Sequence, residues 1–382
     1  MLYTFPDYYQ DFACTAGDCE DTCCSGWQIM VDQKSLKKYK EEKGPYRKVL
    51  KKKIDWREYA FRREPESRRC AFLKEDNLCE MYQQLGADSL CRTCRIYPRH
   101  IEVFEDVREV SLSLSCPEVA RILLSRQEPV HFLQKELDRE EHGDYEDFDP
   151  FLYSMLLDLR GSMIRILQER GLPMPVRMIL TMGMAHEAQM LWDQGQLFSY
   201  SELIQKYEEM AASSLTGESA ATKKASKECR NWEKRFRNDA ALFRKMYRLE
   251  LLNSDWEDSM IEAETILFQK GSEEHQRIWQ EFEAWLEGAD PERLGFHPDI
   301  LSEQIMVYFI YTYFCGAVYD GHILASYQLA SMSLAFLWDL YAACWVLNER
   351  ELTFQDIHSL TYRYSRELEH SDKNLDLLFR IR

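Results

Sequence analysis

The sequence has little of several features that define common protein classes. Its first residues, MLYTFPDYYQDFAC, include no basic segment and no apolar run, so a secretory signal peptide is not expected. Without export a reducing compartment is the default, and disulfides do not persist there. Glycine is sparse, with 15 among 382 residues, and no two glycines are two positions apart, which argues against the glycine-rich loop of a dinucleotide-binding fold. We therefore predict a cytoplasmic protein that is not a disulfide scaffold.

Positive charge is also in short supply. Lys and Arg number 48 against 65 Asp and Glu, a formal net charge of −17, so no nucleic-acid partner is expected. The sequence has no Gly-Lys-Ser/Thr phosphate loop and no G-x-S-x-G turn, and Met190 breaks the H-E-x-x-H pattern. The exception to the acidic balance is Lys34–Arg69, with fifteen Lys and Arg against six Asp and Glu. This basic band predicts either a solvated helix surface or a patch that docks an acidic protein.

One stretch invites comparison with a membrane span. Between Ile305 and Leu347 the formal charges are Asp320 and Asp339 alone, but the interval between those two carries a histidine, a glutamine and three serines. That polar content is unsuited to a lipid-facing helix. We therefore expect buried helices of a soluble core and no membrane partner.

Apolar periodicity divides the chain near residue 125. Asp149-Pro150 is a good helix start, and apolar residues follow it at spacings of three and four. Further long periodic segments cover about 229–252, 256–287 and 302–348. Residues 150–382 are therefore predicted as an all-helical domain, residues 126–149 as an acidic linker, and residues 1–125 as a cysteine-rich metal-binding domain.

The first of these domains also contains a strand signal. Val110, Leu112 and Leu114 alternate with polar residues, and Glu105-Asp106 can turn the chain back on Ile101–Phe104. This pattern predicts a short β-hairpin. The fold class is then mainly α, with a cysteine-rich N-terminal region that carries the hairpin and an all-helical domain behind it.

Nine of the twelve cysteines lie between Cys14 and Cys116, and the only histidine before Cys116 is His100. A metal site in this segment would therefore be all-thiolate, which suits zinc held by four cysteines or an iron–sulfur cluster. Clustered thiolates repel each other unless a cation compensates them. The spacing of radical enzymes, with gaps of three and then two residues after Cys19, is not met because Gly26 stands at the third position.

The last of these nine cysteines and the three that follow it have different predicted roles. Cys116 precedes Pro117 and is predicted at a helix N-cap, where the helix dipole favours an anionic sulfur. Cys229, Cys315 and Cys344 are scattered in helical sequence and are interpreted as small core residues.

Four motifs resemble one known family. They are CEDTCCSGWQIMVD at 19–32, CAFLKEDNLCEMY at 70–82, TCRIYPR at 93–99 and SLSLSCPEVAR at 111–121. The first carries the CxxxCC signature of a zinc- or iron-chelating domain. Together with a long helical region that ends in YSRELEHS at 364–371, they resemble the flagellin lysine N-methylase (FliB) family.

The resemblance implies transfer of methyl groups from S-adenosyl-L-methionine to lysines of flagellin, with a 4Fe-4S iron–sulfur cluster as a second cofactor and zinc as the alternative metal. It also implies a set of candidate metal ligands: Cys14, Cys19, Cys23, Cys24, Cys70, Cys79, Cys94 and Cys116. Cys91 lies outside the shared pattern and is the expected spare. Eight thiols exceed the four that one cluster takes, so either two sites exist or some cysteines are structural.

The helical half offers catalytic candidates without a decisive motif. Tyr311 shares a helix face with Tyr308, where tyrosines could line a cation-binding pocket or simply form an aromatic core stripe. Asp320 beside His322 suggests a general base, although a structural hydrogen bond is the plainer interpretation. His370 belongs to the closing motif.

The leading hypothesis is an S-adenosylmethionine-dependent protein-lysine N-methyltransferase that acts on flagellin and carries an iron–sulfur cluster. Two alternatives stay open: a non-enzymatic metal-binding adaptor, and a redox sensor with exposed low-pKa thiols.

Overall fold

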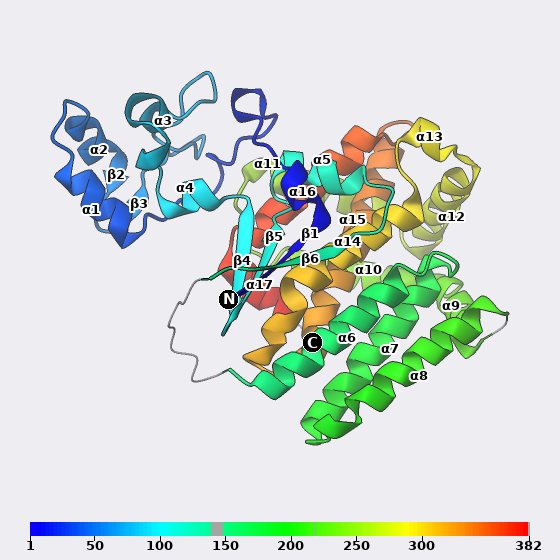
Figure 1. The fold of residues 1–382 in the computed structure, drawn as a ribbon. Helices are drawn as coiled ribbons and strands as arrows, with labels where there is room; N and C mark the ends of the chain where they lie inside the picture. The colour runs from blue at the N-terminus through cyan, green and yellow to red at the C-terminus, as the bar shows by residue number, and fades with distance from the viewer. Residues whose placement is uncertain (139–147, 218, 381–382) are drawn as a thin grey trace.

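The computed structural model describes residues 1–138, 148–217 and 219–380, without the side chains of residues 197 and 229. Figure 1 shows a small unit of short helices and strands beside a larger helical body with a sheet packed on it. The small unit, residues 13–96, is called the cysteine-rich unit below. It has an apolar core of its own around Leu36, Phe72 and Met81, whereas the sheet and the long helices share one larger core. The mainly α fold with a cysteine-rich N-terminal region is confirmed.

The cysteine-rich unit is built from short elements. They are α1 (Gln33–Glu41), α2 (Arg47–Lys53), α3 (Glu80–Leu85), α4 (Arg92–Ile96) and the antiparallel pair β2 (Ile54–Asp55) and β3 (Ala60–Phe61), with 3-10 turns at Ala16–Asp18 and Ala87–Ser89. Asp32 fixes two helix starts, because its carboxylate accepts from Ser35 N at 3.0 Å and from Arg92 N at 2.7 Å.

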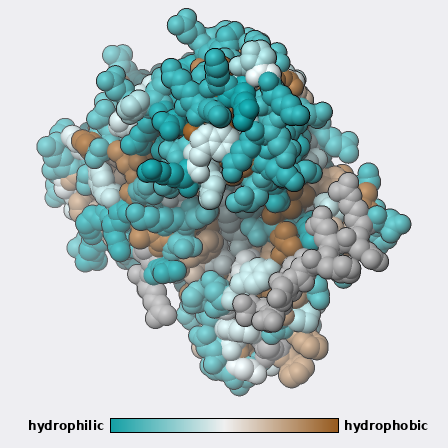
Figure 2. Space-filling model, turned by 90° about the vertical axis from the view of Figure 1, so that its left-hand side faces the viewer, coloured by the Kyte–Doolittle hydropathy of each residue, from teal (hydrophilic) through white to brown (hydrophobic). Residues whose placement is uncertain are grey.

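The lysines of the basic band lie mostly on the exposed faces of α1 and α2. The side of the molecule that carries this unit is largely hydrophilic, and its hydrophobic residues lie in small separate patches (Figure 2). A solvated helix surface, one of the two interpretations of the basic band, therefore accounts for much of its charge.

A four-stranded sheet lies between the cysteine-rich unit and the helices. Its order is β4 (Arg99–Phe104), β5 (Val107–Leu112), β1 (Leu2–Pro6) and β6 (Phe132–Glu136). The β4–β5 pair is the predicted hairpin, with Ile101 opposite Val110 and the turn at Glu105 and Asp106. β1 runs parallel to β5 and antiparallel to β6, so the N-terminus of the chain is held in the middle of the sheet.

Strand β6 falls inside 126–149, the segment predicted as a linker. Its side chains are mostly exposed, so the strand has little apolar signal, and it forms because its backbone pairs with β1. Residues 139–147, which carry most of the acidic run of that predicted linker, lie outside the described residues.

The helical body starts with α5 and continues at α6, where Asp149 accepts from Phe151 N at 2.9 Å and from Leu152 N at 3.0 Å as its N-cap. Its helices are α5 (Pro117–Leu124), α6 (Pro150–Leu167), α7 (Met174–Asp193), α8 (Tyr200–Leu215), α9 (Ala220–Cys229), α10 (Trp232–Met246), α11 (Ser254–Phe268), α12 (Ser272–Gly288), α13 (Pro291–Leu294), α14 (Pro298–Tyr313), α15 (Ile323–Leu347), α16 (Phe354–Glu369) and α17 (Asp372–Arg380). Short 3-10 turns lie at Asp7–Asp11, Leu197–Ser199 and Phe314–Val318.

Helix α15 is the central helix of the body and packs against α7, α10, α11, α12, α14 and α16. It is the one helix in the described ranges with the length and apolar composition to cross a membrane, and 67% of its most apolar window is buried inside the fold. A core helix of a globular protein has the same properties.

The larger core crosses the domain boundary expected near residue 125. Phe104 and Leu112 of the sheet, and Val119 of α5, belong to the same apolar cluster as the long helices. The alternating strand residues turn one face toward the helices, and that contact was not visible in the local sequence. The segment with a separate core is therefore shorter than 1–125.

Candidate active site

The sequence motifs meet where the cysteine-rich unit joins the helical body. The ring of Trp27, from the first motif, stacks on His370 of the closing motif with 4.4 Å between centroids. Tyr97, from the third motif, meets the same imidazole edge-on at 5.6 Å. The hydroxyl of Ser115, from the fourth motif, lies 3.0 Å from both His370 Nε2 and the Tyr97 hydroxyl. Segments more than 340 residues apart in the chain therefore form one cluster.

Arg366, in the last turn of α16, ties a cysteine-bearing loop to this cluster. Its Nε donates to the carbonyl of Ser115 at 2.8 Å, and its Nη1 pairs with Asp21 Oδ1 at 2.5 Å. Asp21 lies between Cys19 and Cys23 in the chain. The buried guanidinium therefore fixes the loop that carries both thiols, with charge-assisted bonds at each end.

A carboxylate lies behind the cluster. Glu369 accepts from the hydroxyls of Tyr313 at 3.0 Å, Tyr308 and Ser113. Burial raises the pKa of Glu369 in spite of these three donors. Since Ser113 Oγ lies 2.5 Å from Ser115 Oγ, hydrogen bonds connect Glu369 to His370.

His370 is neutral near pH 7. Burial, with the nearby charge of Arg366 as a second cause, lowers its pKa to about 3. An imidazole with that pKa is a weak base, since efficient general bases have pKa values near the working pH. The geometry gives His370 a stacking and hydrogen-bonding role.

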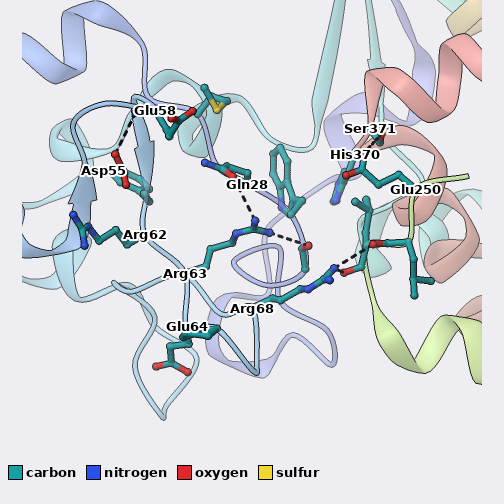
Figure 3. Close-up of a pocket in the computed structure, with 17 residues that line it drawn as sticks. Gln28, Asp55, Glu58, Arg62, Arg63, Glu64, Arg68, Glu250, His370 and Ser371 are labelled. Atoms are coloured by element: carbon teal, nitrogen blue, oxygen red, sulfur yellow. Dashed lines mark hydrogen bonds between the residues drawn. The ribbon is translucent and has the colours of Figure 1, made fainter.

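The Trp27–His370 pair lines a cleft of about 830 Å³ (Figure 3). One wall comes from the cysteine-rich unit, with Asp55, Glu58, Phe61, Arg62, Arg63, Glu64 and Arg68, and the other from Glu250–Leu252 and Ser371. Figure 3 shows Arg63 reaching back to its own wall, where it donates to Gln28 Oε1 at 3.4 Å. Arg68 crosses to the other wall and donates to the carbonyl of Leu251 at 3.2 Å and to that of Leu252.

Hydrogen bonds to Glu367 fix the loop that ends at Asn253 and forms the second wall. Its carboxylate accepts from Leu252 N at 2.7 Å, Asn253 N at 2.9 Å and Asn253 Nδ2 at 2.6 Å. Asn253 in turn approaches Gly26, where a Cβ would lie only 2.5 Å from Asn253 Oδ1 and where φ is +89°. The glycine of the first motif is therefore required both by its backbone conformation and by this contact.

The nine N-terminal cysteines fall into two groups of electrostatically interacting thiols. Burial raises the pKa of Cys116 to about 11 and that of Cys70 to about 12; backbone hydrogen bonds oppose this rise in both, and neighbouring thiols add to it. The first cysteine group is Cys14, Cys19, Cys23 and Cys116. The second cysteine group is Cys24, Cys70, Cys79, Cys91 and Cys94. As predicted, Cys116 is the N-cap residue of α5.

The two groups touch at Cys23 and Cys24. A hydrogen bond between these thiols raises the pKa of Cys23 well above its usual value and lowers that of Cys24 to about 7. The hydroxyl of Thr22 and the charge of Arg366 also lower the pKa of Cys24, against the effect of burial. Cys24 is therefore available as a thiolate near neutral pH, the form that binds metals.

The FliB lysine N-methylase C-terminal domain family matches residues 160–381, more than half of the chain. The chain belongs to this family. Lysine-N-methylases of Salmonella choleraesuis (strain SC-B67) and Salmonella typhimurium are each 30% identical to it over 145 residues, 35% of this chain and 35% of theirs. The flagellar biosynthetic protein FliU of Salmonella muenchen is 32% identical over 135 residues, 33% of this chain and 78% of that protein. The chain thus spans about a third of the length of the lysine-N-methylases it matches, and no solved structure matches it.

Of the four catalytic candidates, His370 is the one that lines the cleft of this FliB-family protein. Tyr311 lies in the core, where its hydroxyl donates to the carbonyl of Thr4 at 2.8 Å. Asp320 and His322 are exposed at the start of α15, and Asp320 accepts from His322 N at 2.8 Å, which is a local loop contact. Tyr311 is therefore a core residue, and Asp320 and His322 form a local hydrogen bond on the surface.

Several site residues were not singled out from the sequence. Trp27, Tyr97 and Glu369 lie inside the sequence motifs at 19–32, 93–99 and 364–371. Their place in those motifs is the sequence signal that could have identified them as site residues. Arg68 lies in the basic band, and its role depends on a loop more than 180 residues away. Cys91, which was expected to be spare, is fully buried within the second cysteine group, and its thiol is hydrogen-bonded to that of Cys94. The side chain of Cys229 lies outside the described part of the chain.

Proposed function

We propose that this protein is an S-adenosylmethionine-dependent protein-lysine N-methyltransferase that modifies flagellin and carries an iron–sulfur cluster on the first cysteine group. Membership of the FliB lysine N-methylase family supports the reaction. The names of the relatives, lysine-N-methylase and flagellar biosynthetic protein, support a flagellar substrate. We also propose that it works in the cytoplasm.

The observation that carries the proposal is the junction itself. Trp27 Nε1 donates to the carbonyl of Cys23 at 2.7 Å, while the Trp27 ring stacks on His370. One residue thus joins the cysteine motif to the floor of the cleft. A binding site and a thiol cluster that share a wall are what an enzyme using both would need.

The cleft suits cationic ligands of moderate size. Its volume lies within the range of small-molecule sites. Its lining includes the carboxylates of Asp55, Glu58, Glu64 and Glu250 and the aromatic rings of Trp27 and Phe61. Three arginines also line it, and Arg63 and Arg68 are hydrogen-bonded to the walls. A lysine side chain and the sulfonium of S-adenosylmethionine are both cations, which carboxylates and aromatic faces stabilise.

The reaction requires a neutral amine. The lysine nitrogen attacks the methyl carbon, forming the N–C bond as the S–C bond breaks and its electron pair returns to sulfur. The ammonium proton must leave beforehand; it can pass to water because the cleft is open to solvent, while the cleft carboxylates would hold the amine in position. His370 holds the Trp27 ring in place, and Arg68 links the two walls by its hydrogen bonds to the carbonyls of Leu251 and Leu252.

The cysteines fit an iron–sulfur cluster better than zinc. Tetrahedral zinc bound by thiolates at about 2.3 Å needs sulfurs roughly 3.8 Å apart. Among the described residues, the one group of three ligand atoms within 4.8 Å of each other contains no cysteine. Cluster ligands bind different iron atoms and lie farther apart. When bound, a cluster on Cys14, Cys19, Cys23 and Cys116 would compensate four thiolates and supply an electron-transfer centre.

The test is methylation by the full chain purified without oxygen. Incubation with S-adenosylmethionine and flagellin, followed by mass spectrometry, should reveal methyl-lysine, and the protein should be brown with broad absorbance near ~400 nm. Trp27→Leu should abolish methylation, while Trp285→Leu, a partly buried tryptophan of α12, should retain it. A colourless zinc protein would overturn the cluster, and equal activity of both variants would overturn the site.

An adaptor is the second candidate. The exposed lysines of α1 and α2 form a basic surface suited to an acidic protein. Binding of flagellin in a pull-down without any methyl-lysine under reducing conditions would favour this function over the enzyme.

A further inference from the structure

A second set of metal-binding side chains lies inside the helical body, away from every cysteine group described above. Helices α10, α12 and α15 pack against one another, and each contributes one residue: Asp239, His275 and Asp339. One ligand atom from each lies within 4.8 Å of the other two. Asp239 Oδ2 and His275 Nε2 are 3.3 Å apart.

His275 and Asp339 are buried and Asp239 is partly buried, and each has a polar atom that is shielded from solvent and lacks a hydrogen-bond partner among the described residues. His275 is 0% exposed, and within the described ranges neither of its ring nitrogens has a hydrogen-bond partner. Asp239 Oδ2 and Asp339 Oδ2 also lack partners. Buried polar atoms are almost always satisfied, so three converging unsatisfied groups indicate a missing ligand. The rings of Phe236 and Phe268 flank His275 at 5.4 and 5.3 Å and shield it from water.

The carboxylate of Asp339 is buried in an otherwise apolar helix, which costs desolvation free energy. Asp339 is the only charged residue in the 25 residues of α15, and it is 1% exposed. An ionised Asp339 therefore needs a cation close by.

The neighbouring arginine does not meet this need. Arg235 Nε is 3.6 Å from Asp239 Oδ2, but its Nη1 bonds Glu283 at 2.8 Å and its guanidinium lies 3.6 Å over the ring of Trp279. One positive charge thus faces three carboxylates. A divalent cation would balance them, with His275 as a neutral ligand.

We propose that Asp239, His275 and Asp339 bind one divalent transition-metal ion that clamps α10, α12 and α15 together. Two carboxylates and one imidazole suit manganese, ferrous iron or zinc, and metal sites built from facing helices of a bundle are common. Because the ligand atoms are inaccessible to solvent, the ion must enter as the protein folds, and its binding contributes to folding. This inference is independent of the methylation proposal.

The experiment uses Mn²⁺, which prefers oxygen and nitrogen ligands and suits thiolates poorly. The full chain is expressed in manganese-supplemented medium, dialysed against EDTA and analysed for metal. We expect about one Mn²⁺ per chain, released only by denaturant, with nitrogen couplings from an imidazole in pulsed EPR. Asp339→Asn and His275→Gln should lose the ion.

Two matched controls should keep it: Asp255→Asn, at a carboxylate that is 74% exposed, and His186→Gln, at an exposed histidine of α7. Circular dichroism checks that each variant folds. If Asp339→Asn does not fold, the manganese content of His275→Gln and the nitrogen couplings of the unmodified chain test the site instead. A chain without EDTA-resistant manganese, or equal manganese in His275→Gln, would overturn the site.

Discussion

The contact between Gly26 and Asn253 provides the sharpest test of the junction. Gly26→Ala forces an L-residue to φ of +89°, which costs on the order of 1–3 kcal/mol. It also places a Cβ 2.5 Å from Asn253 Oδ1, so Asn253 must move. That movement strains its bonds to the buried carboxylate of Glu367, which are worth roughly 1.5–3 kcal/mol when the acceptor is charged. The expected destabilisation is therefore about 2.5–6 kcal/mol.

Gly86 provides the matched control. It lies in the same cysteine-rich unit with φ of +80°, and its Cβ would meet nothing within 4 Å. Gly86→Ala should lose only the backbone term. Urea denaturation of both variants measures the difference, and the methylation assay shows whether the cleft wall has shifted. Equal destabilisation of the two variants would refute the claim that the first motif requires glycine because of Asn253.

Three further predictions follow from individual positions. Cys91→Ala should destabilise the chain as strongly as Cys70→Ala, because both thiols are buried in the second cysteine group, with the partly buried Cys344→Ala as the control; a melting temperature unchanged by Cys91→Ala would contradict this structural role. Tyr311→Phe and His322→Asn should retain methylation, because neither side chain lines the cleft; loss of turnover with an unchanged melting temperature would contradict the placement. His370, whose pKa falls from about 6.5 in the unfolded chain to about 3 when folded, contributes stability above pH ~6.5 that is lost toward pH 3. The unfolding free energy of His370→Asn, measured in urea, should therefore fall less steeply below pH 6.5, and an identical slope would contradict the neutral imidazole.

Local signals predicted the elements that local interactions form. The start of α6 follows from Asp149-Pro150, and the β4–β5 hairpin follows from alternation on both sides of a two-residue turn. Strands β1 and β6 left no such signal. β1 pairs in parallel with β5 more than a hundred residues later, and β6 is exposed on most of its length, so neither needs an apolar pattern of its own.

The candidate site was predictable as a set of motifs and not as a geometry. Nothing near Arg68 indicates that it will bond the carbonyl of Leu251, because that contact depends on how two units pack. Cys91 is predicted to be spare because it lies outside the shared pattern, and that stays a prediction. Its burial beside Cys94 depends on this chain's own fold, which the pattern does not describe. Spacing alone could not reveal which thiols share a group.

The closing motif explains why the family-matched region and the N-terminal segment form one site. Arg366, Glu369 and His370 are spaced three and four positions apart, which places them on one side of the end of α16, toward the segment around Ser113 and Ser115. Glu367 points elsewhere and holds the loop that ends at Asn253. The last turn of α16 thus holds the N-terminal segments through Arg366 and the loop of the second wall through Glu367. Residues 160–381 alone would leave Arg366 without Ser115 and Asp21, and Glu369 without Ser113, so the helical region and the N-terminal motifs form this site together.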